Sequence, residues 1–402
     1  MAGIRETSLY RFYRFVVFFL FIFSMYPWIT WRLDSRIVWA IALIFSSLLF
    51  FMERDKLKKR NDSVFVTICL FALILWIQKS TLMALLFGVG LCWCIYVFLM
   101  LRIEYKKDII NFITKWFAVI LGVSLVYFVL YNLGIPLPHN TILFAEVSNY
   151  SNFNNYYFFI QPDLSYHNFR FQSIFLEPGH MVMGLAPLLF VNQYNLKNRY
   201  VVIMLVALLS SFSLAAYVVT AVGFIWEFVL RGNYKSLAVS GLMLIIFVAF
   251  IARFYEGDLF DELIFQRLHF EDGDISGNDR MNLYFAGVFA SFVQSSDFLL
   301  GVGTFDQDEM FYGHGSSGWQ VFTYIYGLVG LLIGIIAYLS PAFTHRIKWS
   351  VWGLSIICLL ILAVNGYPTW WCMLIIITFG SELLSESTEA KDNKKQMIIR
   401  NK

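Results

Sequence analysis

Long apolar runs set the strongest limit on how this chain can fold. A helix needs about 20 apolar residues to cross the hydrocarbon core of a bilayer. Of the 402 residues, 59% are apolar and only 14% are charged, and no soluble core could bury such a share. We therefore predict an all-α polytopic membrane protein in which residues 1–402 form a single integral membrane domain. About 12 transmembrane helices are expected, near residues 11–31, 36–52, 63–78, 80–101, 112–133, 176–193, 199–211, 213–231, 235–252, 319–341, 348–364 and 368–385.

The positive charges predict which ends of these helices face the cytoplasm. With a cytoplasmic N-terminus and twelve crossings, 23 of the 30 Lys and Arg lie on the inner side and seven on the outer side. This is the bias of the positive-inside rule. Residues 199–231 could instead form one crossing broken near Ser210, but that reading moves the basic C-terminal tail outside. We therefore expect two crossings there, both termini in the cytoplasm, and residence in the bacterial plasma (inner) membrane.

The same topology places two long segments on the outer side, residues 134–174 and 253–318. The second holds twelve Asp and Glu against three Arg, and both are rich in aromatic residues. Loops of this length are usually functional or disordered, and the aromatic content argues against disorder. Within the second loop, Asp279 to Gln294 predicts an amphipathic helix with Asp279 as its N-cap.

Several kinds of chemistry find no support in the sequence. The five cysteines all lie inside apolar runs, with no metal-ligand or disulfide spacing, so we interpret them as packing residues. No phosphate-binding Gly-x-x-x-x-Gly-Lys motif is present. We therefore expect neither a cofactor nor a metal. The net charge of +3 is too small to suggest a nucleic-acid partner.

The outer cations are, apart from Lys79, all arginines. Arginine binds phosphate or carboxylate through two parallel hydrogen bonds. Arg170 begins a segment that ends in Glu177-Pro178-Gly179-His180, where Pro178 suits the first turn of a helix. Glu177 and His180 then lie at the membrane surface, a depth at which ionisable residues are usually functional. The alternative for His180 is a hydrogen-bonded structural residue.

A second group of candidate residues lies in the second outer loop and comprises Arg267, Arg280 and His314. Arg280 opens the predicted amphipathic helix. His314 lies in a stretch with three glycines, Gly313–Gly318, directly before a membrane run. Glycines allow a ligand to approach the backbone closely, which favours a functional role over an ordinary loop histidine.

Taken in order, these residues resemble the O-antigen polymerase and O-antigen ligase superfamily, over roughly residues 170 to 330. The motifs that carry the resemblance are Arg170 with Glu177-Pro178, Arg267-Leu268, Gly277-Asn278-Asp279-Arg280, Phe298-Leu299-Leu300-Gly301-Val302-Gly303, His314, and Tyr326-Gly327-Leu328-Val329-Gly330. The chain departs from the pattern after His314, where Gly315-Ser316-Ser317 stands in place of the asparagine that many relatives have.

The resemblance implies a GT-C-like, metal-independent glycosyltransferase that polymerises undecaprenyl-diphosphate-linked oligosaccharide repeat units at the outer face of the plasma membrane. Arg170 and Arg280, with Arg267 a weaker match, would bind the diphosphate and stabilise its developing charge. Glu177 and His314 are the candidate bases, and His180 a further substrate contact. Aromatic residues of the first outer loop would stack on sugars. Implied partners are the lipid-linked glycan, membrane lipids, a chain-length regulator and a flippase.

Three other functions remain open at this stage. A ligase that transfers finished glycan to a lipid or protein acceptor would use the same residue types. A polysaccharide or lipid transporter would need charges within its membrane helices, where Glu227 is a rare example. A structural assembly partner would use the long loops for docking. The concentration of polar chemistry in the outer loops favours an enzyme over a transporter.

Overall fold

The computed structural model describes residues 7–58, 63–143, 152–163, 170–232, 270–271, 274–275, 283–303, 318–345 and 348–400, and these are mostly helical. The α-helices are α1 (Ser8–Phe23), α2 (Ser35–Met52), α3 (Val64–Ile77), α4 (Leu82–Met100), α5 (Ile103–Asn132), α6 (Pro178–Val191), α7 (Arg199–Leu209), α8 (Leu214–Arg231), α10 (Leu283–Val293), α12 (Gly318–Thr344), α13 (Trp349–Asn365) and α14 (Trp371–Arg400). Each predicted membrane run contains a helix except 235–252, which lies outside the described residues.

Within the described residues, four helices are long and apolar enough to cross a membrane: α2, α4, α5 and α12. Five more apolar helices are shorter, namely α3, α6, α7, α8 and α13. Every described α-helix except α10 contributes residues to one large hydrophobic core. These features agree with the expected helical membrane protein.

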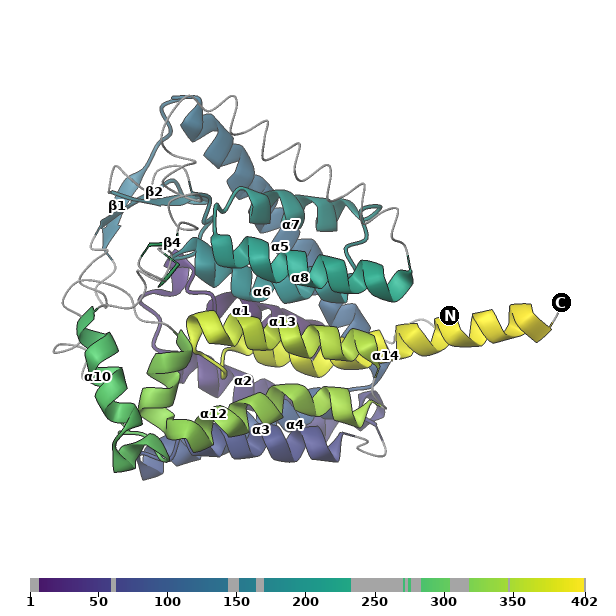
Figure 1. Cartoon of the computed structure of the whole chain (residues 1–402). Helices are drawn as coiled ribbons and strands as arrows, with labels where there is room; N and C mark the ends of the chain where they lie inside the picture. Colours follow the sequence, from purple (N-terminus) through teal and green to yellow (C-terminus); the bar gives the residue numbers. More distant parts are fainter. Residues whose placement is uncertain are drawn as a thin grey trace.

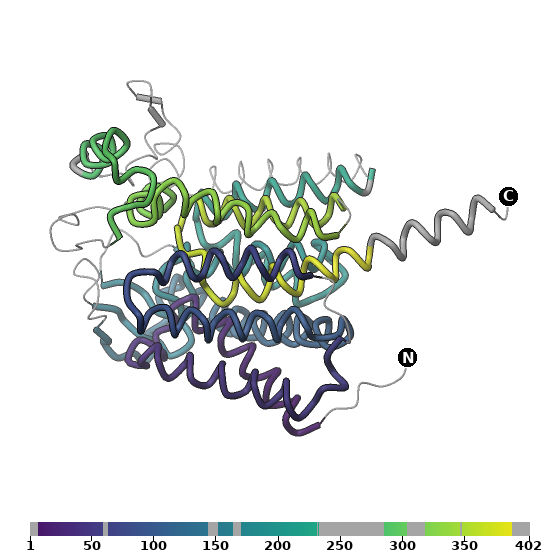
Figure 2. The backbone as a smooth tube through the Cα atoms, turned by 90° about the horizontal axis from the view of Figure 1, so that it is seen from below, coloured from purple at the N-terminus to yellow at the C-terminus, as the bar shows by residue number. Residues whose placement is uncertain are grey.

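The helices run side by side, and the bundle has two different ends (Figure 1). A small β-sheet and α10 lie at one end, which we call the sheet end. The start of α1 lies at the other end, and α14 runs towards that end (Figures 1 and 2). The two outer loops of the sequence prediction therefore contribute their described elements to the same end of the bundle.

Residues 199–231 form two helices, as predicted, rather than one. Helix α7 ends at Leu209, and Ser213 caps α8 by accepting a hydrogen bond from the backbone N–H of Ala216. The turn between them lies at the sheet end, where the carbonyl of Ser210 accepts a hydrogen bond from the N–H of Phe171 (3.0 Å). Serines favour such turns because their hydroxyls bond nearby backbone groups.

Some element boundaries differ from the prediction. Helix α1 ends at Phe23, well before Trp31, because Pro27 cannot continue a helix and restricts the residue before it. Helix α5 begins at Ile103, earlier than the apolar run that starts at 112, so its first turns are charged. Helix α10 covers the core of the predicted amphipathic helix, whose proposed cap Asp279 lies outside the described residues.

The expectation of an all-α chain is incomplete, because the first outer loop contains a three-stranded antiparallel sheet. Its order is β1 (Asn140–Leu143), β2 (Asn152–Asn155), β3 (Ile160–Pro162), and a short hairpin of β4 (Phe270–Glu271) and β5 (Asp274–Ile275) lies in the second loop. Phe153 and Ile160 are buried in a small cluster with Leu176, against Trp28 and Trp31. Burial of Phe153 and Ile160 thus stabilises the strands. Their asparagines interrupt the alternation of apolar and polar residues by which a strand is recognised in a sequence.

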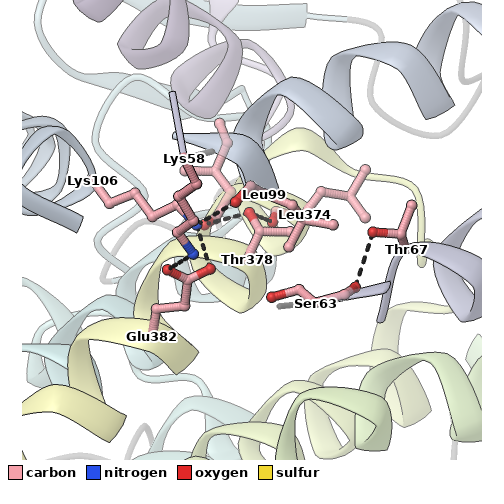
Figure 3. A network of polar contacts seen from close by, with 9 residues as sticks. Lys58, Ser63, Thr67, Leu99, Lys106, Leu374, Thr378 and Glu382 are labelled. Atoms are coloured by element: carbon pink, nitrogen blue, oxygen red, sulfur yellow. Dashed lines mark hydrogen bonds and ion pairs between the residues drawn. The ribbon is translucent and has the colours of Figure 1, made fainter. Parts of the chain in front are cut away.

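A buried ion network joins distant segments near the charged start of α5 (Figure 3). The fully buried Lys106 lies 2.5 Å from one carboxylate oxygen of Glu382 on α14, and Lys58 lies 2.6 Å from the other. Lys106 also donates to the carbonyl of Leu99 (3.1 Å). One carboxylate therefore links α14 to α5 and to the segment after α2.

Candidate functional site

A largely buried segment without regular secondary structure, which we call the strap (Arg170–Leu176), leads from the sheet into α6. Phe171 to Leu176 are all buried. The carbonyl of Ser173 accepts from the N–H of Ile160 in β3 (2.9 Å), and the hydroxyls of Ser173 and Ser124 of α5 lie 2.7 Å apart. Trp28 N–H donates to the carbonyl of Ile174 (2.9 Å). The strap is therefore fixed on several sides by hydrogen bonds.

Beyond the strap, the structure brings the predicted residues Glu177 and His180 together with three aromatic rings. The His180 ring centroid lies 5.6 Å from that of Tyr26 and 5.3 Å from that of Trp370, and Tyr367 stacks on Trp370 at 5.0 Å. The Glu177 carboxylate lies within electrostatic range of both His180 and Tyr367. We call these five residues the Glu177 cluster.

Three parts of the chain build the Glu177 cluster. Tyr26 follows the end of α1, Glu177 and His180 lie at the start of α6, and Tyr367 and Trp370 lie between α13 and α14. The hydroxyl of Ser24 accepts a hydrogen bond from the N–H of Cys372 (3.0 Å), which ties the end of α1 to the start of α14. Gly184 lets α6 pack closely on α1, because a Cβ there would meet the side chains of Met25 and Phe21.

Pro178 occupies the first turn of α6, as the sequence predicted, and Glu177 is its N-cap residue. The Glu177 carboxylate does not cap the helix, and it makes no side-chain hydrogen bond or ion pair with any residue in the described ranges. The Nδ1 atom of His180 is buried and has no hydrogen-bond partner within those same ranges. A buried polar atom without a hydrogen-bond partner commonly has a catalytic role or binds a water molecule or ion.

Strained backbone gathers around the strap. Non-glycine residues with positive φ include Tyr26 (54°), Ser173 (56°) and Phe212 (45°). Tyr26 and Ser173 bond directly to the strap or belong to it, and Phe212 lies in the turn that Phe171 contacts. Such conformations cost about 1–3 kcal/mol each and concentrate at functional sites.

Arg170 lies at the other end of the strap from Glu177. It is partly buried and within electrostatic range of the phenol of Tyr217, at the start of α8. Six buried residues of strap separate it from Glu177 along the chain. Of the other predicted site residues, Arg267, Arg280 and His314 lie outside the described residues.

The aromatic residues of the first outer loop do not form one exposed surface. Phe153, Tyr156 and Phe159 are buried, whereas Tyr157 and Phe158 are exposed. The first three rings therefore stabilise the sheet end and cannot stack on a sugar. The aromatic residues beside Glu177 and His180 come instead from Tyr26, Tyr367 and Trp370.

Two motifs that carried the family resemblance lie against each other. Helix α12 is broken at Gly327 (φ 73°), and the carbonyls of Tyr324 and Ile325 accept hydrogen bonds from the N–H groups of Val302 and Gly303, both 3.0 Å. A Cβ on Gly301 or Gly327 would meet the backbone of the opposite motif. These glycines therefore serve close backbone packing and a left-handed conformation.

The start of α12 also lies against the Glu177 cluster. Gly366, next to Tyr367, has a positive φ (65°), and a Cβ on it would meet the backbone of Gly318. Gly318 is the first residue of α12 and follows His314 by four positions in the sequence. The second outer loop therefore rejoins the bundle next to Tyr367.

An open apolar groove of about 380 Å³ lies along α2 and shares no lining residue with the Glu177 cluster. Its lining is apolar apart from Ser47, and consists of Leu43, Ile44, Ser47, Leu48 and Phe51. Such a lining suits a hydrocarbon chain rather than polar chemistry. Within the described residues, no three His, Cys, Asp or Glu side chains gather as a metal site would require.

The sequence interpretation missed Tyr26, Tyr367 and Trp370. Their only signal was position, since each lies at or beside the end of an apolar run on the predicted outer side, where aromatic residues are common for other reasons. The chain matches no family model, no curated protein and no solved structure, so the chemistry of the site must be inferred from its own residues.

Proposed function

We propose that this chain is a membrane glycosyltransferase that polymerises undecaprenyl-diphosphate-linked oligosaccharide repeat units at the outer face of the bacterial plasma membrane. One observation carries the proposal: at one end of a bundle of apolar helices, an imidazole lies beside a group of aromatic rings and within electrostatic range of a carboxylate, and neither group has a hydrogen-bond partner among the described residues. Ionisable groups at such a depth are costly and are retained for function.

The proposed chemistry is substitution at the anomeric carbon of the donor sugar. An acceptor hydroxyl attacks this carbon and gives its proton to Glu177, while the bond to the diphosphate oxygen breaks and polyprenyl diphosphate leaves. Arg170, together with Arg280 and Arg267 of the second outer loop, stabilises the charge that develops on the diphosphate. His314 is the alternative base, and His180 is a further contact for the substrate.

The proposal requires twelve crossings with the sheet end outside and both termini in the cytoplasm. Alkaline phosphatase fused after Asp163, which follows β3, should therefore be active, because that enzyme matures only outside the cytoplasm. A fusion after Lys58 should be inactive. The reverse pattern would place the Glu177 cluster on the cytoplasmic side and exclude a donor presented at the outer face.

The function is tested by deleting the gene and restoring it with variants. A deletion strain should retain single repeat units on its surface glycan and lose the ladder of longer chains. Wild-type protein should restore the ladder, and Arg170→Ala at equal membrane abundance should not. A normal ladder in the deletion strain would refute the proposal.

A ligase is the nearest alternative, because the same carboxylate and arginines could join finished glycan to another acceptor. Its loss would accumulate long glycan on undecaprenyl diphosphate rather than single units, which the same gels distinguish. A transporter is less well supported, since the Glu177 cluster lies at helix ends and not in the middle of the bundle.

A further inference from the structure

The Glu177 cluster has an exposed aromatic surface. Tyr26 is 40% exposed and Tyr367 is 52% exposed, while Trp370 is buried behind them. Tyr367 and Trp370 stack nearly in parallel, at an interplanar angle of 15°, and Trp370 lies 5.4 Å from Tyr26. The exposed rings of Tyr26 and Tyr367 are therefore both supported by contact with the buried ring of Trp370.

Polar groups border the rings on the side of α6. The Glu177 carboxylate makes no hydrogen bond with any residue in the described ranges, and it lies within electrostatic range of His180 and Tyr367. A ligand that fits must offer both an apolar face and hydrogen-bonding groups at its edge. A pyranose ring does so, because its axial C–H bonds carry partial positive charge that suits the negative face of an aromatic ring, and its hydroxyls project around the edge.

An ordinary belt of aromatic residues at the membrane surface would not explain this arrangement. Tyr26 adopts φ 54°, and its carbonyl accepts from both the N–H of Leu176 and the indole N–H of Trp31, each at 3.1 Å. These bonds fix a costly conformation that brings its ring toward His180. An anchoring tyrosine needs only to reach the headgroups and has no use for a fixed backbone.

We infer that Tyr26 and Tyr367, supported from behind by Trp370, form a pyranose-binding surface for the terminal sugar of the acceptor glycan, with Glu177 at its nucleophilic hydroxyl. The inference rests on the proposed function for the name of the ligand. It assigns the surface to the acceptor rather than the donor, because the base must touch the attacking hydroxyl.

The test measures binding of soluble glycan to the purified protein in lipid nanodiscs, without detergents that carry sugar headgroups. The probe is the oligosaccharide released by mild acid from the lipid-linked pool of the host strain, and saturation-transfer NMR gives its affinity. Tyr367→Leu should raise Kd about tenfold, a typical loss for one stacking contact. Tyr367→Phe, which keeps the ring, should stay within about twofold of the wild-type Kd.

Tyr157→Leu is the matched control, because Tyr157 is also 52% exposed at the sheet end but does not belong to the Glu177 cluster. Its Kd should equal that of the wild type. Equal binding by Tyr367→Leu and wild type, or a loss caused by Tyr157→Leu instead, would overturn the inference. Failure of the proposed function is seen separately, as a normal ladder in the deletion strain, and would leave a measured difference between the Tyr367 variants intact.

Discussion

Glu177 is the residue on which the proposed chemistry depends most. Its carboxylate makes no hydrogen bond or ion pair among the described residues, so replacing it should not disturb folding. We predict that Glu177→Gln lowers the rate of glycan polymerisation by about 10²–10⁴-fold, the usual contribution of a general base. The ladder and a turnover assay on lipid-linked repeat units measure the change.

The control at the same scale is Glu104→Gln. Glu104 is an exposed carboxylate in the first turn of α5, 3.8 Å from Arg102, far along the chain from the strap. This variant should polymerise at the wild-type rate. A ladder of normal length from Glu177→Gln, at normal abundance, would transfer the role of base to His314 or remove it from this site.

At the scale of elements, the break in α12 is a packing device. Gly327 holds a positive φ while its backbone lies against that of the segment around Gly301. Gly327→Ala adds a Cβ that clashes with the backbone of Leu299 and Gly301. We therefore predict that the free energy of unfolding falls by about 1–3 kcal/mol. The melting temperature of the detergent-solubilised protein, and its monodisperse fraction, report this loss.

Gly287→Ala provides a contrast within the same segment of the chain. Gly287 lies in α10, with negative φ and open space around its Cα, so alanine should be neutral or raise stability by up to about 1 kcal/mol. If both alanine variants melt alike, the close contact between the two glycine motifs does not limit stability.

At the scale of the whole molecule, the Lys106–Glu382–Lys58 network joins segments that are hundreds of residues apart in sequence. Lys106→Met should cost about 1–3 kcal/mol, because it removes the fully buried one of the two lysines that pair with Glu382, while Lys58 stays beside the other carboxylate oxygen. Replacing Glu382 by Met in the same chain should recover much of that loss, since no buried carboxylate is then left. Melting temperatures of the single and double variants test this, and equal melting of Lys106→Met and wild type would contradict it.

His345, just after α12, makes stability depend on pH near this network. Its burial lowers the pKa of the imidazole below the ordinary 6.5, Glu382 opposes the shift, and Lys106, Lys58 and Lys348 add to it. The unfolded chain therefore binds a proton more readily than the folded chain. The free energy of unfolding is unaffected by His345 above pH 6.5, and it falls as the pH drops from 6.5 through the pKa of the folded state. The melting temperature should decline between pH 7 and about 5. His345→Gln should flatten that decline, and an unchanged slope would exclude His345 as its source.

Much of the helical frame could be predicted because hydropathy acts locally. Each apolar run in the described residues holds a helix, and Pro178 and the Ser210–Ser213 break have the local roles expected of proline and serine. The first turns of α5 were missed because they contain charged residues such as Lys106, which a search for apolar runs excludes. Packing against other helices nevertheless buries Lys106. The strands were missed because burial of Phe153 and Ile160 depends on Trp28, which is remote in sequence.

The candidate site divides in the same way. Glu177 and His180 could be selected from the sequence because their types and spacing lie in one short segment that enters an apolar helix. Their neighbours Tyr26, Tyr367 and Trp370 could not, since these residues lie about 150 to 190 positions away and meet only through packing of α1, α6 and α14. The two glycine motifs were visible as sequence, but their mutual contact was not.

The sequence by itself determined a helical, membrane-type chain with its carboxylate and imidazole placed at the start of one apolar helix, because hydrophobicity and helix-end chemistry act over a few residues. Only the tertiary structure decided that residues 171–176 of the strap are buried, that the His180 ring lies beside Tyr26 and Trp370, and that Lys106 pairs with Glu382. Those outcomes depend on which helices, distant in sequence, pack together. The free energy of such packing comes from contacts of many side chains, so no single sequence motif determines it.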